Sequence, residues 1–456
     1  MHCFNFLGIV VKFSDVSTCI FARNSTVMLK SAEGMNIPET NLPRLVVIGG
    51  GFGGMQLITR LPARRFQTVL IDKHNYHTFQ PLLYQVATAG LEPDSIAYPL
   101  RKVFIKRHEF YFRMSEVTGV DVEKNEVQTD IGNLQYDYLV VATGSTTNFF
   151  GNASFESLSM GMKNIPEALN IRSLLLQNFE KALLTSDLKE RESLMNVVIV
   201  GAGPTGVELA GAIAELRRHV LPNDYPDLDF RRMNIHLVEA GDRVLASMSE
   251  NASAHAKKYL ENLGVQIWLN TKVEDYDGKT ITTSQKPMPA QTFVWAAGVK
   301  GAPVEGFSAD QMARQQRIKV DVYNRVQDCN NVFAIGDVAY METEEYPNGH
   351  PMVAQVAIQA GKHLASNLLR NEDKKELKPF KYKDLGSMAT IGRKRAVADL
   401  PRQQLQGGFA WLVWMFVHLM ALVGFRNRVV VFFNWTYNFF NYNRDIRLII
   451  RPFSRD

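Results

Sequence analysis

The 456-residue chain contains only three cysteines, at positions 3, 19 and 329. No two of them form a CxxC motif or any other close pair, which excludes a redox-active disulfide and the ligand spacings typical of zinc and iron–sulfur sites. We therefore expect no bound metal. Cys329 precedes an apolar run and is expected to be a small buried or loop residue.

The chain also has little net charge. Its formal charge is +5, which does not suggest a nucleic-acid partner. Residues 381–456 nevertheless carry 12 Lys and Arg against 4 Asp and Glu, a local net charge of +8 that leaves about −3 on the remainder. A basic end on a mildly acidic body predicts that this end meets an anionic surface, such as a layer of lipid headgroups.

The first 43 residues lack the signature of an export signal. Short apolar runs are mixed there with Lys12, Asp15 and Arg23, instead of a basic segment followed by a clean apolar one. Residues 1–43 are therefore predicted to be a disordered extension or a stretch upstream of the true start. Met35 or Met28 is the start that we expect.

What the chain does contain is two glycine fingerprints of the same type, 152 residues apart. Each follows a run of four apolar residues, at 45–48 and at 197–200. In such a strand-to-helix turn, the first glycine allows the sharp bend, the second lets backbone approach a pyrophosphate, and the third lets the helix pack on the strand. The helix N-terminus then faces the anion. The residues predicted to bind dinucleotides at the two turns are Gly49, Gly51, Phe52, Gly53 and Gly54, and Gly201, Gly203, Pro204, Thr205 and Gly206.

An acidic residue ends the next apolar run after each fingerprint. Asp72 lies 18 residues past Gly54, close to the spacing expected of a ribose-binding acid, and Glu239 follows the apolar run 235–238. A carboxylate pairs with a free ribose 2′-hydroxyl but repels a 2′-phosphate, so Glu239 favours NADH over NADPH. Arg243, four residues on, could soften that preference.

A third apolar run, 332–335, ends in Gly336-Asp337, and an aspartate there can accept hydrogen bonds from a flavin's ribityl chain. Together with Ala142-Thr143-Gly144 and Ala297-Gly298, it makes the chain resemble the two-dinucleotide-binding flavoproteins. The resemblance implies FAD at the first fingerprint and NAD(P)H at the second. The absence of a close cysteine pair after the first fingerprint argues against a disulfide reductase and against a sulfide:quinone oxidoreductase.

The expected fold is therefore α/β, with two Rossmann-like dinucleotide-binding domains. The FAD domain would be split into residues 44–155 and 305–375, on either side of an NADH domain at 156–304. Residues 376–456 would form an amphipathic helical segment that associates with a membrane.

Residues 409–425 are almost continuously apolar, at the short limit for a membrane-spanning helix. The stretch after Arg426 and Arg428 is aromatic but carries a polar stripe at helical spacing, formed by Asn434, Asn438, Asn441 and Asp445. Three interpretations are open: core or dimer-interface helices, a transmembrane hairpin, and monotopic insertion. We favour monotopic insertion, with one helix deep in the leaflet boundary and the other at the headgroups; a homodimer through this region is also plausible.

Two further segments make the chain resemble the type II NADH:quinone oxidoreductases, single-subunit respiratory enzymes that do not pump protons. They are Phe79-Gln-Pro-Leu-Leu-Tyr-Gln-Val-Ala-Thr-Ala89 and Ala354-Gln-Val-Ala-Ile-Gln359, and the resemblance extends over residues 40–450. It implies FAD, NADH as co-substrate, a membrane quinone as acceptor, and a peripheral position on the cytoplasmic face of the inner membrane. No series of membrane-spanning segments that could pump protons is visible in the sequence.

Four residues are predicted to act on the quinone. If Pro351 lies in the first turn of a helix, Gln355 and Gln359 are one turn apart on one face, where their amides could bind quinone carbonyls; the alternative is that they cap backbone groups. The resemblance also places Gln355 beside the flavin. Glu208 is expected in the first turn of the helix after the second fingerprint, where it either stabilises the helix N-terminus or delivers protons. Lys394 is either a residue at the mouth of the quinone tunnel or part of a solvated basic patch.

Two other functions remain open at this stage. A reductase of a protein electron carrier, such as ferredoxin or rubredoxin, would share both fingerprints but would not need the C-terminal helices. A non-enzymatic membrane protein that binds FAD and NADH as ligands would show negligible flavin turnover.

Overall fold

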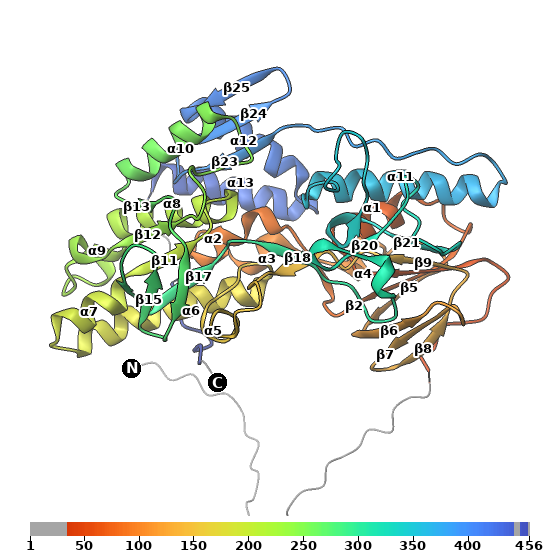
Figure 1. Ribbon diagram of the computed structural model, residues 1–456, viewed down its shortest axis with the longest axis horizontal. Coiled ribbons are helices and arrows are strands. Elements are labelled where there is room, and N and C mark those ends of the chain that lie inside the picture. The colour runs from red at the N-terminus through yellow and green to blue at the C-terminus, as the bar shows by residue number, and fades with distance from the viewer. Residues whose placement is uncertain (1–33, 442–446, 455–456) are drawn as a thin grey trace, which may run out of the picture.

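The computed structural model describes residues 34–441 and 447–454. The predicted extension at 1–43 therefore lies largely outside the described residues, as do Cys3, Cys19 and Asp445. The chain forms two lobes, each built on a parallel sheet, with the C-terminal elements above and behind them (Figure 1).

The first lobe contains a five-stranded parallel sheet with strand order β21-β9-β1-β2-β5. After Arg44, its central strand is apolar and buried, as expected of a parallel strand covered on both faces. The sheet gathers residues from distant parts of the chain, so that its edge strand β21 follows β9 by almost 200 residues. Its strands are β1 (Arg44–Ile48), β2 (Gln67–Asp72), β5 (Phe110–Met114), β9 (Tyr138–Val141) and β21 (Val332–Ala334).

The second lobe contains a four-stranded parallel sheet with strand order β13-β12-β11-β17. It lies between β9 and β21 in the sequence, and both sheets support the predicted α/β class with Rossmann-like topology. Its strands are β11 (Val197–Val200), β12 (Ile235–Val238), β13 (Gln266–Trp268) and β17 (Thr292–Trp295).

A helix follows each fingerprint directly. Helix α1 (Phe52–Arg60) begins after Gly51, and α8 (Pro204–His219) begins after Gly203. A long helix, α11 (Ala354–Glu372), packs along α1 on the first lobe (Figure 1). This packing depends on Gly361, where a Cβ would overlap the carbonyl oxygen of Gly53.

Two expectations about these helices are wrong. Pro351 lies three residues before α11, whose N-cap is Val353, because residues 350–352 do not take up helical structure. Glu208 is the fifth residue of α8, in its second turn, because Pro204 is the first. It is therefore past the free amides of the helix N-terminus, so the capping role does not apply.

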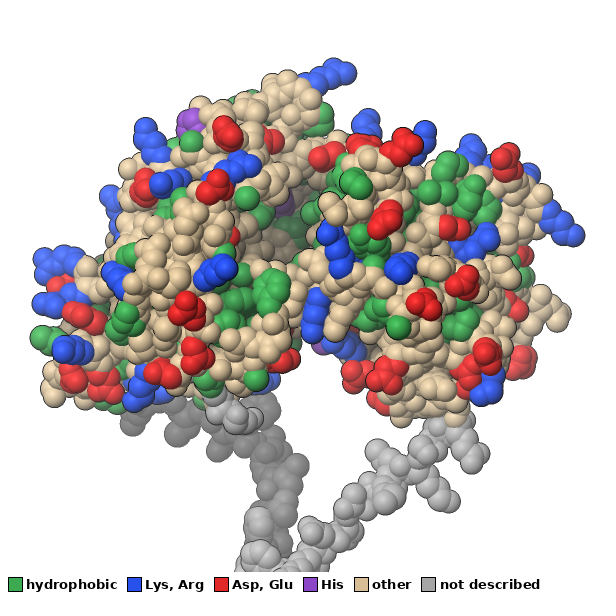
Figure 2. Space-filling model, viewed as in Figure 1, with side chains coloured by type: hydrophobic (Ala, Val, Ile, Leu, Met, Phe, Trp, Pro, Cys, Tyr) green, Lys and Arg blue, Asp and Glu red, His purple; other side chains and the backbone are tan. Residues whose placement is uncertain are grey.

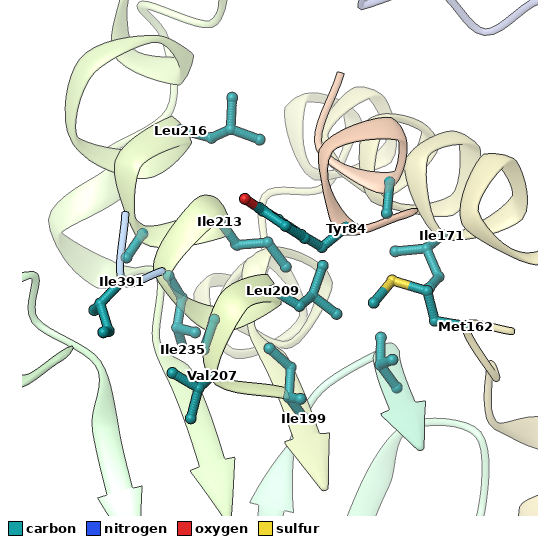
Figure 3. Close-up of a cluster of buried hydrophobic side chains, with 14 of the residues drawn as sticks. Tyr84, Met162, Ile171, Ile199, Val207, Leu209, Ile213, Leu216, Ile235 and Ile391 are labelled. Carbon is teal, nitrogen blue, oxygen red and sulfur yellow. The ribbon is translucent and has the colours of Figure 1, made fainter. Parts of the chain in front are cut away.

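A short segment of the first lobe packs into the core of the second. Helix α2 (Leu83–Ala87) contacts both α8 and α6 (Ile165–Leu184). Tyr84 of α2 lies close to Leu209 and Ile213 of α8 (Figure 3). The two lobes are also joined by an antiparallel pair, β10 (Ser145–Thr147) with β18 (Val299–Gly301).

The C-terminal elements form an antiparallel sheet followed by two helices. The strands β23 (Ser387–Thr390), β24 (Ala396–Leu400) and β25 (Gln403–Gln406) lead into α12 (Gly407–Ala421), and α13 (Phe425–Phe440) follows. Trp414 and Trp435 are buried against the second lobe, so each helix has one face in the core. None of the helices in the described part of the chain combines the length and the apolar composition needed to cross a membrane.

The remaining elements complete the two lobes. Residues 223–232, a polar insert in the sequence, form short helical turns whose Tyr225 and Phe230 pack on Phe179. The other helices are α3 (Pro93–Ile96), α4 (Leu100–Val103), α5 (Ala153–Leu158), α7 (Leu188–Met195), α9 (Leu221–Asp224) and α10 (Glu250–Asn262), with 3-10 turns η1 (Gln80–Leu82), η2 (Phe230–Arg232), η3 (Ala309–Gln311), η4 (Arg314–Gln316) and η5 (Gly336–Val338). The other strands are β3 (Tyr76–Thr78), β4 (Ala97–Pro99), β6 (Val117–Asp121), β7 (Glu126–Thr129), β8 (Gly132–Gln135), β14 (Val273–Tyr276), β15 (Thr280–Thr283), β16 (Met288–Pro289), β19 (Met312–Ala313), β20 (Arg317–Lys319) and β22 (Ala339–Tyr340).

The close contact at Gly361 generates a prediction. Gly361→Ala adds a methyl group that α11 can accommodate only by moving away from α1, so we expect a loss of about 1–3 kcal/mol in the free energy of unfolding. Denaturant titration measures it. Gly408→Ala in α12 is the matched control, because its Cβ would lie 3.8 Å from the nearest atom, and it should be neutral or slightly stabilising. Equal stability of the two variants would contradict the prediction.

Candidate active site

An elongated cavity of about 450 Å³ opens at the carboxyl ends of the first sheet's strands. This is where open α/β sheets bind ligands. The cavity collects the predicted residues of four separate segments, and α11 contributes Ala354 and Ala357. The predicted residues that line it are Gly49, Gly51, Phe52, Gly53, Asp72, Ala142, Thr143, Gly144, Gly336 and Asp337.

The first fingerprint has the geometry that its glycines predict. Gly49 has φ +104°, and a Cβ there would overlap the carbonyl oxygen of Ala142. A Cβ on Gly54 would overlap the carbonyl oxygen of Gly49, so this glycine packs helix on strand and does not line the cavity. Gly51 has no neighbour within 4 Å of an added Cβ, which leaves its backbone open to a ligand. It caps α1 without a side-chain hydrogen bond, so the helix N-terminus is available to an anion.

Polar groups converge on the cavity from the neighbouring strands. The carboxylate of Asp72 accepts hydrogen bonds from the backbone amides of Gly50 (2.6 Å) and His74 (2.7 Å). Burial raises the pKa of Asp72, and these amides lower it. The hydroxyl of Ser145 donates to Asp337 at 2.6 Å, while the buried Thr143 Oγ1 has no partner among the described residues.

Sequence reasoning missed several lining residues. Ser145 directly follows the Ala-Thr-Gly segment, so its position next to that motif was the available signal. Lys163 and Asn164 reach the cavity from the start of α6, and nothing in their local sequence indicates this. Met352 lines it from the segment before α11.

The second fingerprint repeats the same geometry in the second lobe. Gly201 has φ +98°, and a Cβ there would lie 2.6 Å from the carbonyl oxygen of Ala296. A Cβ on Gly206 would overlap the Gly201 carbonyl, whereas Gly203 is open and caps α8. Pro204 and Thr205, in the first turn of α8, are exposed.

The acid after the second fingerprint is held at this turn. The carboxylate of Glu239 accepts hydrogen bonds from the backbone amides of Ala202 (2.7 Å) and Gly241 (2.8 Å). Arg243 does not contact it; its guanidinium donates to the backbone carbonyls of Ala246 and Met248. Of the predicted Ala297-Gly298 pair, Gly298 has φ +156°, and a Cβ there would lie 3.0 Å from the ring of Phe150.

The two glutamines of α11 make hydrogen bonds to backbone. Gln355 donates to the carbonyl of Gly386 (2.7 Å) and accepts from the amide of Leu385 (3.1 Å). Gln359 makes the same double contact with Lys383, at 2.8 and 3.0 Å. The side-chain amides thus bind backbone groups and hold residues 383–386 against α11. Neither glutamine lines the cavity that contains Gly336 and Asp337.

Glu208 is a buried carboxyl between the second lobe and the C-terminal sheet. Its Oε1 accepts a hydrogen bond from the backbone amide of Thr390 in β23 at 3.3 Å. Burial raises the pKa of Glu208 to about 8, and the Thr390 amide lowers it. Glu208 is therefore a group that can hold or release a proton near neutral pH.

Lys394 lies in the exposed turn between β23 and β24. Its Nζ sits 4.7 Å from the ring centroid of Phe439 on α13. It does not line the cavity of the first lobe. Beside this turn, a small cavity of about 50 Å³ lies among Tyr84, Gln85, Trp414 and Trp435. The structure thus places Lys394 close to the C-terminal helices.

The face shown in Figure 2 is hollowed between the two lobes, and its acidic and basic side chains are intermixed. Within residues 34–441 and 447–454, no group of three or more His, Cys, Asp and Glu side chains is arranged to hold a metal ion.

Comparison with known proteins agrees with this geometry. The family model described as pyridine nucleotide-disulphide oxidoreductase matches residues 43–361, and the one described as NDH2 C-terminal domain matches residues 385–445. The type II NADH:quinone oxidoreductase Ndh of Mycobacterium tuberculosis is 36% identical over 88% of this chain and 89% of its own length. Its paralogue NdhA is 36% identical over 87% of both chains.

Solved structures agree on the fold. The structure of NDH2 from Plasmodium falciparum in complex with NADH superposes with a TM-score of 0.80 at 23% identity, covering 90% of this chain and all of that one. Two glycine turns at the ends of two parallel sheets, with an acid after each, define a two-dinucleotide flavoprotein of the pyridine nucleotide-disulphide oxidoreductase class. Within that class, the chain belongs to the type II NADH:quinone oxidoreductase family.

The pKa of Glu208 generates a prediction about stability. The Glu208 carboxyl has a pKa of about 8 in the folded protein and its ordinary value of 4.5 in the unfolded chain, so the folded protein binds the proton more tightly. The resulting stabilisation is complete below pH 4.5 and is lost as the pH rises through about 8. Glu208→Gln removes this titration. From about pH 6 to about pH 9, the thermal midpoint of wild type should therefore fall more than that of the variant. Parallel melting profiles over this range would contradict the burial effect.

Proposed function

We propose that this respiratory FAD-dependent NADH:quinone oxidoreductase binds FAD in the first lobe's cavity, NADH at the second fingerprint, and a membrane quinone that arrives from the side of the C-terminal helices. FAD, when bound, accepts hydride from NADH and returns two electrons to the quinone, without proton pumping. The single observation that carries the assignment is the pairing of two complete glycine turns with one sheet each.

The residues of the first lobe fit FAD. The open backbone at Gly51 and the N-terminus of α1 suit a pyrophosphate, and Asp72 suits a ribose. The orphaned Thr143 hydroxyl and the Ser145–Asp337 pair offer hydrogen bonds to a polar chain along the cavity. We propose that residues 44–155 and 305–375 supply this site, because β21 completes the sheet of β1 and β9.

The residues of the second lobe fit NADH. Two backbone amides hold the carboxylate of Glu239 at the place where a 2′-phosphate would have to sit. Arg243 is committed to backbone carbonyls and does not neutralise it. We therefore assign residues 156–304 to NADH in preference to NADPH, with Ala297 and Gly298 at the nicotinamide end.

The quinone site is proposed next to the N-terminus of α11. Ala354 and Ala357 reach the cavity, and the other face of the helix holds residues 383–386 through Gln355 and Gln359. To bind quinone directly, each side-chain amide would have to give up its two hydrogen bonds to residues 383–386. We therefore assign the two glutamines the role of positioning this segment beside the quinone site. Quinone reduction consumes two protons, and Glu208 is the buried group suited to supply one. Lys394 is assigned to the mouth of the path, near α13.

The C-terminal helices offer a surface that suits a lipid layer. Trp411 and Trp414 of α12 and Trp435 of α13 are buried, whereas other large apolar side chains of both helices are exposed. The two helices contact each other. Arg426 lies exposed at the start of α13. We propose monotopic attachment through this face, with basic groups meeting anionic lipid. The exposed apolar residues are Phe409, Leu412, Phe416, Val417 and Met420 on α12, and Phe425, Phe432, Phe433 and Tyr437 on α13.

The same surface weighs against reduction of a soluble protein carrier. Such a reductase needs a polar docking surface near the flavin and has no use for a row of exposed phenylalanines. A non-enzymatic role would leave the buried carboxyl of Glu208 without a purpose, since a buried acid that has one long hydrogen bond and no charged partner is costly to keep.

Anaerobic stopped-flow spectroscopy of the FAD-loaded protein in lipid vesicles tests the proposed function. NADH should bleach the flavin absorbance rapidly, and subsequent addition of ubiquinone or menaquinone should restore it, because each substrate has its own route to the flavin. NADPH serves as the matched control and should bleach it more slowly. Rapid bleaching without recovery by either quinone would point to a protein acceptor, and no bleaching would leave only the ligand-binding function.

Membrane attachment is tested by flotation with vesicles that contain anionic lipid. Phe416 is 63% exposed, and its replacement in Phe416→Asp should weaken binding at least about tenfold, because an inserted aromatic side chain contributes about 1.5–3 kcal/mol. Leu184→Asp is the control, since Leu184 is 87% exposed but lies at the end of α6. If both variants float like wild type, α12 is not the attachment site.

A further inference from the structure

A chain of hydrogen bonds connects the last described helix to Glu208. The indole Nε1 of Trp435 in α13 donates to Gln85 Oε1 at 2.9 Å, and Gln85 Nε2 donates to Tyr84 Oη at 2.8 Å. Tyr84 Oη lies 3.1 Å from Thr390 Oγ1, and the Thr390 amide donates to Glu208 at 3.3 Å. The chain therefore passes through α13, α2, β23 and α8, four elements that are far apart in the sequence.

The chain runs through an apolar interior. Tyr84, Thr390, Glu208 and Trp435 are all buried. Figure 3 shows the ring of Tyr84 next to Ile213 of α8, with its hydroxyl directed away from Ile171 and Met162. In such surroundings a hydrogen bond is strong and a lost partner is expensive, so the geometry of each member is tied to that of the next.

We propose that Tyr84 and Thr390 are positioning residues for Glu208. Through Trp435, the positions of these two side chains depend on how α13 packs against the rest of the protein. The proposal rests on the proton-supplying role of Glu208 in the proposed function. The Tyr84 hydroxyl fixes the side chain of Thr390, and this fixes the direction of the Thr390 amide toward the carboxylate. At 3.3 Å that last bond is long, so a small shift of the β23 backbone at Thr390 breaks it.

The Thr390 amide is the polar group that bears directly on the protonation of Glu208. The pKa of Glu208 is governed by burial and the Thr390 amide, and by none of the titratable groups on the elements packed against α8. Those groups are Tyr84 on α2, Asp224 on α9, His236 on β12, and Glu250, His255, Lys257, Lys258, Tyr259 and Glu261 on α10. A hydrogen bond to a carboxylate favours its charged form. Loss of the amide contact therefore makes Glu208 a weaker acid.

The experiment follows the protonation of Glu208 directly. In full-length, FAD-loaded protein with lipid, infrared spectroscopy records the carbonyl band of the protonated carboxyl as a function of pH, and its absence in Glu208→Gln identifies it. Tyr84→Phe and Thr390→Val each remove one side of the Tyr84–Thr390 contact while keeping the Thr390 amide. Each should raise the midpoint by about half a pH unit or more. The double variant should raise it no further, because both changes break the same contact.

Three matched variants make the test decisive. Thr390→Ser keeps the hydroxyl and should restore the wild-type midpoint, and Tyr276→Phe removes a buried tyrosine hydroxyl elsewhere in the second lobe and should have no effect. Trp435→Phe should shift the midpoint in the same direction as Tyr84→Phe. An unchanged or lowered midpoint in Tyr84→Phe and Thr390→Val overturns the positioning role, and an unchanged one in Trp435→Phe overturns the dependence on α13.

The same samples separate this inference from the proposed function. If Glu208→Gln leaves quinone-driven flavin recovery unchanged across pH, the proton-supplying role fails, yet the midpoint shifts still report whether Tyr84 and Thr390 position the carboxyl. If Glu208→Gln slows recovery but the midpoint does not respond to Tyr84→Phe, the proposed function stands and the positioning inference fails.

Discussion

The close approach of α11 to α1 is the contact on which the arrangement of the active site depends. It is possible only because Gly361 faces the backbone of Gly53, where any side chain would overlap a carbonyl oxygen. With α11 seated there, Ala354 and Ala357 reach the first cavity, and the glutamines on another face of the helix hold residues 383–386. The path from the fingerprint to the C-terminal sheet is thus one close backbone approach followed by side-chain amides that hold backbone groups, and each contact sets the position of the next.

A second contact joins the lobes to each other. Helix α2 leaves the first lobe and packs among the apolar side chains of α6 and α8, so the elements that bear the two fingerprints share a core. The two dinucleotide sites therefore cannot move independently without opening that core, which interiors of native packing density resist. Hydride transfer requires such fixed distances, since a displacement of about 1 Å is enough to slow it strongly.

The parts of the site that could be predicted from sequence are those in which structure is determined by neighbouring residues. The glycine turns, Asp72 and Glu239 each depend on a strand and the few residues after it; the glycines form sharp turns there, and each acid accepts a hydrogen bond from an amide of its own turn. The hydrogen-bond partners of Gln355 and Gln359 lie 24 to 31 residues away, in a segment without a recognisable motif. The sequence therefore could not show that backbone groups already bind these two side-chain amides. The burial of Glu208 depends on β23, some 180 residues later in the chain.

The location of Glu208 explains why a buried acid without a charged partner is useful here. Burial favours its proton, the Thr390 amide favours its charge, and the two effects oppose each other at the boundary between the second lobe and the C-terminal elements. A pKa set by a neighbouring charge would change little when helices shift, because Coulomb interactions decline slowly with distance. A pKa set by packing changes sharply once water or a polar ligand enters. Proton release from Glu208 is therefore sensitive to the positions of α2, β23 and α13 around it, and α13 is one of the two helices that we propose to meet the lipid.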